Sequence, residues 1–420
     1  MTRPAISHFS KRVIFIALTL TLAGCGGRLE GVMKPVGPVS IQGATPVNML
    51  VATTRQPSGD PAILFNGERG TSLKIDAVTI SIPPDKNRKI GEVQWPKKLP
   101  PDPSKSFTTV SVTPLPTERD GRNWLRKNSF NKHRVLVFVH GFNNTYEDSV
   151  YRFAQIVHDS KTDVVPVLFT WPSRASIFDY NYDKESTNYS RDALEDLLTR
   201  VSNEPGVTDV TVMAHSMGSW LAVEALRQMA IRHGRVNAKI ANVILASPDL
   251  DVDVFKSQFV SLGPKHPHFT IFVSRDDRAL SISRRISGNV DRLGQINAAQ
   301  EPYRSALEAA GVTVIDLTKL KTGDQLNHGK FAESPQVVRL IGDRLLSGQT
   351  VTDSNVGFGE ALGAVAIGTS STIGQVASSA ISAPIMIFDA RTRRNYNDQI
   401  KQVGNSAGST FGALSDTVPR

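Results

Sequence analysis

The sequence predicts an α/β fold, in which a mostly parallel central sheet carries helices on both faces and is preceded by antiparallel β-strands. Buried-type apolar runs of strand length alternate with segments of helical spacing over residues 133–348. This alternation is typical of a parallel sheet with crossover helices. Shorter β-prone runs, separated by turn residues, precede that block over residues 49–132. They favour antiparallel strands that either lead the larger sheet or form a small lobe of their own.

The first residues resemble a bacterial secretion signal. Residues 1–24 combine a basic start with the apolar run VIFIALTLTLA, which is too short to span a bilayer as a stop-transfer helix. The run ends in LAGC, which resembles the lipobox of bacterial lipoproteins; an ordinary signal peptide with a chance cysteine is the alternative. The resemblance implies a lipid anchor at Cys25 in the cell envelope. Because no aspartate follows Cys25, it also implies the outer membrane, facing the periplasm.

Three further regions complete the organisation of the chain. Residues 25–48 are rich in Gly, Pro and Val and are predicted to be a tether. The β-rich N-terminal region, residues 49–132, contains the runs MLVATTR, AVTISIPP, GEVQWP and FTTVSVTP. Residues 133–348 form the predicted catalytic domain, from the strand RVLVFVHG to the last helix, QVVRLIGDRLL. Residues 349–420 are dominated by small residues and are predicted to be a loosely ordered or partner-docking tail, in preference to a membrane span.

Composition excludes several kinds of chemistry. Cys25 is the only cysteine, so the chain has no disulfide framework, no thiolate metal cluster and no catalytic thiol. The formal net charge is +9, but basic residues are interleaved with acidic ones. Because no basic stripe carries stacking aromatics, nucleic-acid binding is unsupported. No H-E-x-x-H motif is present, and we expect neither a metal nor another cofactor.

The stretch VTVMAHSMGSW, residues 210–220, indicates a strand, a sharp turn and a helix with Ser216 at the apex. Turns of the G-x-S-x-G kind expose a serine hydroxyl on strained backbone, where it serves as a nucleophile. Here Ala214 stands at the first position of the pattern. The alternative is that Ser216 only caps the following helix.

A second turn lies in VFVHGFNN, residues 137–144. A strand that ends in His140, Gly141 and Phe142 places backbone N–H groups beside the neighbouring strand. The amides of Phe142 and Met217 are therefore predicted to hold a developing oxyanion. A tight strand-to-helix turn is the simpler interpretation, and both can hold together.

The general base follows by elimination among nine histidines. Only His328, in KTGDQLNHGKF, follows the last predicted strand in a loop at the carboxyl ends of the strands. A base for serine needs such a positioned loop. Trp171 and Phe178, which follow an earlier strand, line the acyl or leaving-group pocket or serve in packing, with equal weight.

The carboxylate that orients the imidazole has several candidates. Asp277 is favoured because Ser216, Asp277 and His328 then occur in the order serine, acid, histidine. Capping of the next helix is the alternative role of Asp277. Asp249 is the principal alternative acid; the remaining candidates are Asp276 and Asp251.

Five short motifs carry a resemblance to a known family. They are VHGFN (139–143), TWPS (170–173), AHSMG (214–218), ASPD (246–249) and SRDDRAL (274–280). With them, residues 133–347 resemble the α/β-hydrolase superfamily and, more narrowly, a poorly characterised bacterial branch of esterase- or lipase-like serine hydrolases. In that branch alanine is usual at the first position of the serine motif.

The resemblance implies an α/β-hydrolase fold and a membrane-anchored serine hydrolase. Its substrate would be a small-molecule or lipid carboxylic ester, cleaved through an acyl-enzyme. Two alternatives stay open, namely a catalytically silent envelope binding protein on the same fold and an amide or peptide hydrolase.

Overall fold

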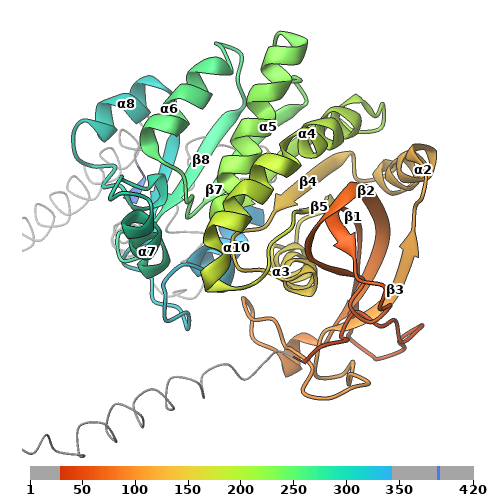
Figure 1. The fold of residues 1–420 in the computed structure, drawn as a ribbon. Helices are drawn as coiled ribbons and strands as arrows, with labels where there is room; N and C mark the ends of the chain where they lie inside the picture. The colour runs from red at the N-terminus through yellow and green to blue at the C-terminus, as the bar shows by residue number, and fades with distance from the viewer. Residues whose placement is uncertain (1–28, 343–385, 388–420) are drawn as a thin grey trace, which may run out of the picture.

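The computed structural model describes residues 29–342 and 386–387. The strands of these residues form one ten-stranded sheet in the order β10-β9-β8-β7-β6-β4-β5-β1-β2-β3, and helices cover both of its faces (Figure 1). The predicted α/β fold is therefore confirmed. The predicted signal, Cys25 and, apart from two residues, the predicted tail lie outside the described residues.

Seven neighbouring strands run parallel. They are β1 (Thr45–Pro57), β4 (Arg134–Val139), β5 (Val165–Thr170), β6 (Asp209–His215), β7 (Ile240–Ala246), β8 (His268–Val273) and β9 (Thr313–Asp316). The antiparallel strands are β2 (Phe65–Ile82), β3 (Thr108–Pro114) and the two-residue β10 (Met386–Ile387). All six residues of β5 are buried, as expected for a strand covered on both faces.

The helices divide between the two faces of the sheet. One face carries α2 (Glu118–Ser129), α4 (Tyr180–Asn203), α5 (Met217–His233), α6 (Val252–Ser261) and α8 (Tyr303–Ala309). The other carries α3 (Tyr146–Asp159), α9 (Lys330–Glu333) and α10 (Pro335–Leu340). Local sequence sets where helices begin: Thr117 and Thr145 start α2 and α3 through capping boxes with Asp120 and Asp148. Within the described residues, no helix combines the length and the apolarity needed to cross a bilayer.

The N-terminal region is part of the same sheet. β1 pairs in parallel with β5 and antiparallel with β2, so the predicted β-prone runs lead the large sheet and form no separate lobe. The region also contains α2, and GEVQWP forms no strand. The predicted tether is packed against the domain only in places: Val32 and Met33 are buried, most of residues 34–46 are exposed or half-buried, and β1 already begins at Thr45.

Candidate active site

The strand order of the sheet reverses at the carboxyl ends of β4 and β6. β4 lies between β5 and β6 in the sheet. The chain therefore adds β5 on one side of β4 and then adds β6 and the later strands on the other side. Ligands of open α/β sheets bind at such a reversal. Gly141 follows β4 and Ser216 follows β6, so both predicted turns lie at this place.

Ser216 occupies a strained turn between β6 and α5. Its φ is 52° and its ψ is −126°, and such backbone costs a non-glycine residue about 1–3 kcal/mol. The residue stands at the N-cap of α5, but its side chain makes no capping hydrogen bond. The alternative prediction, that Ser216 serves as a helix cap, is therefore wrong.

Two glycines let the turns after β4 and β6 approach each other. A Cβ atom on Gly141 would lie 2.8 Å from the Cβ of Ser216, and a Cβ atom on Gly218 would lie 2.2 Å from the carbonyl oxygen of His140. Any larger side chain at either position would force the two turns apart. Ala214 lies fully buried within β6, where its methyl group fits into the sheet.

The amides of Phe142 and Met217 belong to these two turns. Met217 is the first residue of α5, so its N–H has no acceptor within the helix. On the other turn, the side-chain amide of Asn144 donates to the carbonyl oxygens of Phe142, at 2.8 Å, and Gly141, at 3.2 Å. Both predicted oxyanion donors therefore belong to turns that lie beside Ser216.

A buried arginine from the N-terminal region holds the turn after β4. Arg55, in β1, donates from Nη2 to the carbonyl oxygen of Asn144 at 2.7 Å and from Nη1 to that of Ser173 at 2.9 Å. Its Nε donates to Oγ1 of Thr170 at 2.9 Å. Burial lowers the pKa of Arg55 to about 10, so the guanidinium is still charged at neutral pH. Sequence analysis missed Arg55 because its acceptors are distant in the chain and are mostly backbone groups.

Replacing Arg55 by alanine is expected to lower kcat/KM about 100-fold, since a misplacement of about 1 Å in a catalytic turn costs about that much. Millimolar guanidinium should restore part of the activity, which a general loss of stability would not allow. Arg69→Ala is the matched control, because Arg69 joins β2 to Ser186 and Tyr182 of α4 instead. Equal losses in both variants, without rescue, would contradict this role.

Asp277 and His328 are joined by a hydrogen bond. Nδ1 of His328 lies 2.7 Å from Oδ2 of Asp277, which is fully buried. The other oxygen of Asp277 accepts from the N–H of Leu280 at 2.9 Å and caps α7 (Arg278–Ile286). Asp277 therefore both contacts the histidine and caps the helix, with one carboxylate oxygen for each.

The other candidate acids have different partners. Asp249 contacts Tyr180, Ser283 and Arg292, Asp251 caps α6, and Asp276 contacts Ser274 and Lys330. Of the four candidate carboxylates, only Asp277 hydrogen-bonds the imidazole of His328 within the described part of the chain. Asp249 still borders the site, since its N–H donates to the carbonyl oxygen of Ser216 at 3.1 Å.

Two side chains that sequence analysis missed fix the loop of His328. Oδ2 of Asp324 accepts from the N–H groups of His328, at 2.5 Å, and Gly329, at 2.8 Å. The fully buried Lys330 pairs with Asp276 at 2.7 Å, which ties this loop to the segment after β8. The only local sign in the sequence of the contacts made by Asp324 was its position a few residues before His328.

The charges around His328 favour its protonated form. Burial by itself lowers the pKa of the imidazole, but the charge and hydrogen bond of Asp277, with the charges of Asp249 and Asp324, outweigh burial. The pKa of His328 is therefore raised above its ordinary value of 6.5. The ring of His215 lies 4.7 Å from that of His328, and burial and the neighbouring His328 lower the pKa of His215, which stays neutral.

The positions of Trp171 and Phe178 do not support a role in lining a pocket. Trp171 is fully buried, its ring is stacked on His140 at 4.9 Å, and its Nε1 donates to the carbonyl oxygen of His140 at 2.8 Å. It therefore packs beneath the turn after β4, which was the alternative. Phe178 faces outward and is 92% exposed.

No group of three or more His, Cys, Asp or Glu side chains is arranged to hold a metal ion in residues 29–342.

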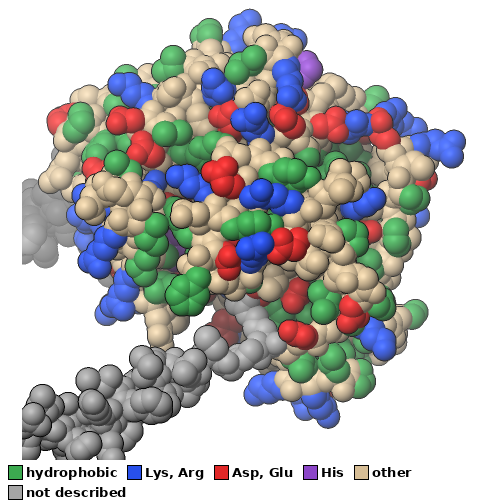
Figure 2. All heavy atoms as spheres, viewed as in Figure 1, with side chains coloured by type: hydrophobic (Ala, Val, Ile, Leu, Met, Phe, Trp, Pro, Cys, Tyr) green, Lys and Arg blue, Asp and Glu red, His purple; other side chains and the backbone are tan. Residues whose placement is uncertain are grey.

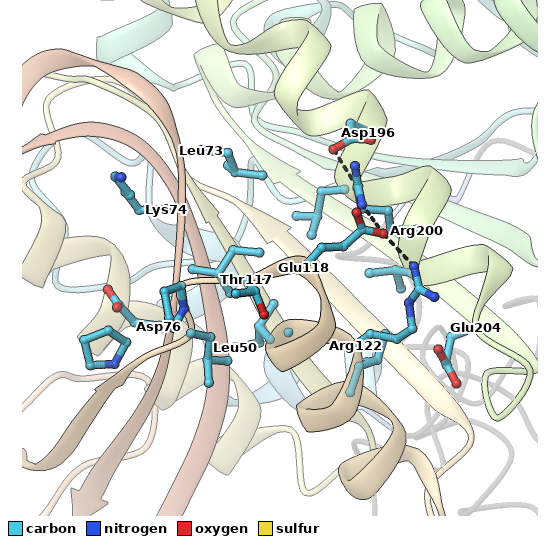
Figure 3. Close-up of a pocket in the computed structure, with 18 of the residues that line it drawn as sticks. Leu50, Leu73, Lys74, Asp76, Thr117, Glu118, Arg122, Asp196, Arg200 and Glu204 are labelled. Carbon is cyan, nitrogen blue, oxygen red and sulfur yellow. Dashed lines mark hydrogen bonds and ion pairs between the residues drawn. The ribbon is translucent and has the colours of Figure 1, made fainter.

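A large cavity, of about 1110 Å³, lies away from Ser216 between α2, α4 and β2 (Figure 3). Its walls include Leu50, Leu73 and Leu197, and Figure 3 shows the carboxylate of Glu118 between two arginines. The charged groups at its rim pair as Glu118 with Arg122 and Arg200, Asp196 with Arg200, and Glu204 with Arg126. None of the predicted site residues lines this cavity.

A match to a known protein family agrees with this architecture. The model of a family described as "Alpha/beta hydrolase of unknown function (DUF900)" matches residues 117–344, more than half of the chain. An uncharacterized protein from Nostoc sp. is 34% identical over 79 residues, which are 18% of this chain and 21% of that protein. The chain thus spans about a fifth of the length of this curated relative.

Two solved structures of an esterase from the archaeon Pyrobaculum calidifontis were also matched, each at 12% identity. The first has a TM-score of 0.31 and covers 83% of this chain and 95% of the esterase chain. The second has a TM-score of 0.32 and covers 81% and 94%. The family match supports hydrolase activity and leaves the substrate open. The chain belongs to the alpha/beta hydrolase family of unknown function that matches residues 117–344.

Proposed function

We propose that this protein is a serine hydrolase that cleaves carboxylic esters through an acyl-enzyme at Ser216. The observation that carries the proposal is the strained turn of Ser216, whose hydroxyl does not cap α5. It is supported by the hydrogen-bonded pair of Asp277 and His328 at the same end of the sheet. Ester chemistry is the finer part of the proposal, since the same groups serve amide hydrolysis.

In the proposed mechanism, Nε2 of His328 takes the proton of the Ser216 hydroxyl as Oγ attacks the carbonyl carbon of the ester. The resulting oxyanion is stabilised by the amides of Phe142 and Met217. The imidazolium, stabilised by Asp277, then gives its proton to the departing alkoxide, which leaves the acyl group on Oγ. His328 next takes a proton from water, which attacks the acyl carbon, and returns it to Oγ as the acid is released.

Covalent labelling by a fluorophosphonate tests this proposal, because such probes trap activated serines. We expect one labelled peptide containing Ser216, together with faster turnover of esters than of matched amides. Folded protein that takes up no label would favour a catalytically silent binding protein. Faster turnover of the amides would instead favour an amide or peptide hydrolase.

We propose in addition that the chain is anchored by lipid at Cys25 in the bacterial cell envelope, on the periplasmic side of the outer membrane. The support is the LAGC segment and the basic and apolar residues before it. Bacterial cells fed a radioactive fatty acid are expected to label the protein, and Cys25→Ala should remove the label. Label that persists in Cys25→Ala would exclude this anchor.

A further inference from the structure

Exposed apolar side chains border the candidate active site. They come from the segments that follow β5, β8 and β9. Their exposed fractions are 66% for Ile177, 92% for Phe178, 52% for Ile282, 54% for Ile286 and 46% for Leu326. We call these five side chains the apolar rim. Single exposed apolar residues are ordinary, but several around one site indicate an interaction surface.

Hydrogen bonds join the three segments of the apolar rim. The hydroxyl of Tyr180, which directly follows the turn of Ile177–Asp179, lies 2.9 Å from Oγ of Ser283 in α7. The N–H of Arg278, at the start of α7, donates to the carbonyl oxygen of Leu326 at 2.8 Å. The apolar rim therefore belongs to one connected border, and the proposed acid and base lie one residue from Arg278 and two residues from Leu326 in the chain.

The same border carries positive charge that nearby carboxylates do not neutralise. Arg278, Arg285, Lys319 and Lys321 are exposed and have no acidic partner in the part of the chain that the structure describes. Neighbouring acids are already engaged, since Asp291 pairs with Arg284 and Asp316 with Arg275. Figure 2 shows hydrophobic and basic side chains next to one another over α7.

Helix α7 combines both features on one face. Arg278, Ile282 and Ile286 are spaced four residues apart and are exposed, whereas Leu280 and Ser283 are buried on the opposite face. Apolar side chains flanked by cations are the pattern of helices that lie in a membrane interface, and anionic lipid headgroups attract such cations. We infer that the apolar rim and its four unpaired cations dock on a lipid bilayer that contains anionic lipid.

Vesicle binding by the full chain tests this inference. The probes are vesicles of phosphatidylcholine alone and vesicles with added phosphatidylglycerol. The apolar variant combines Phe178→Ser, Ile282→Ser and Ile286→Ser; the charge variant combines Arg278→Gln, Arg285→Gln, Lys319→Gln and Lys321→Gln. The control combines Ile231→Ser and Val260→Ser. These side chains are 57% and 71% exposed, and they lie near the carboxyl ends of α5 and α6.

The apolar variant is expected to bind both kinds of vesicle about tenfold more weakly than wild type. The charge variant should lose the preference for phosphatidylglycerol, and the control should bind like wild type. All variants keep residues 1–28, so any anchor there contributes equally to each. Measuring the set in a Ser216→Ala background separates docking from catalysis, because binding needs no turnover.

Three results would overturn the inference. The first is wild-type protein with no preference for phosphatidylglycerol. The second is an apolar or charge variant, folded by circular dichroism, that binds both vesicles like wild type. The third is unchanged vesicle binding together with a loss of self-association in solution, which would assign the surface to a second copy of the chain.

Discussion

Replacing Ser216 by alanine is expected to lower the turnover of ester hydrolysis by about four to six orders of magnitude. Removing the hydroxyl removes the atom that forms the acyl-enzyme. The other contacts of residue 216 are through its backbone, so the fold should be retained: its N–H donates to Ala246 and its carbonyl oxygen accepts from Asp249. Steady-state turnover of an activated ester measures the effect, and urea unfolding checks the stability of the variant.

Ser219→Ala is the matched control for this measurement. Ser219 is fully buried in the first turn of the same helix, and its hydroxyl donates to the carbonyl oxygen of Ala214 at 3.3 Å. This substitution should cost about 1 kcal/mol of stability and change turnover little. Full activity in Ser216→Ala would remove Ser216 from the proposed mechanism.

The second large effect is expected from Asp277→Asn, which should lower turnover by about four orders of magnitude. The amide still fills the buried position but presents a donor or a neutral oxygen to Nδ1 of His328. The imidazole then loses both the tautomer and the charge that the proposed mechanism needs. The change is measured as kcat, with binding of a substrate analogue as a check that the site still forms.

The pH dependence of the same variant gives an independent readout. Because the base acts in its neutral form and the pKa of His328 is raised above 6.5, kcat/KM of the wild type should fall as the pH drops through a value above 6.5. Removing the Asp277 charge should move this fall toward lower pH. A wild-type midpoint below 6.5, or no movement in Asp277→Asn, would contradict the assignment.

Asp249→Asn distinguishes the two candidate acids. Asp249 lies 3.3 Å from the buried Arg292 and accepts from Ser283 and Tyr180. Its replacement leaves the guanidinium without its counter-charge and should lower the free energy of unfolding by about 3 kcal/mol. Turnover of the folded variant should stay within about tenfold of wild type. A larger loss of turnover than in Asp277→Asn would make Asp249 the acid.

The parallel part of the fold could be predicted because its strands are covered on both faces and read as continuous apolar runs. β4 and β5 illustrate this, with runs of buried residues that local sequence already displays. The pairing of β1 with β5 could not be predicted, since the register of strands more than 100 residues apart leaves no local signal. The packing of Val32 and Met33 was missed for a similar reason, because two apolar residues in a Gly- and Pro-rich stretch have no periodicity.

Sequence analysis identified the site residues that stand in a distinctive motif or directly after a predicted strand. Asp277 and His328 were identified in this way, and the structure brings them into contact. Arg55 was missed because it acts on backbone carbonyls, which any residue supplies. The outward position of Phe178 was missed because its place in the segment after β5 does not fix the direction of its side chain.

The place of β1 between β5 and β2 sets where the chain can be shortened. The family match begins at residue 117, after β1, β2 and β3. A fragment starting there would turn β5 into an edge strand whose backbone groups are unpaired and whose six side chains are all apolar or uncharged. Such edges recruit strands from other molecules and lead to aggregation. The unit that can fold in isolation therefore begins before Thr45, well ahead of the segment that defines the family.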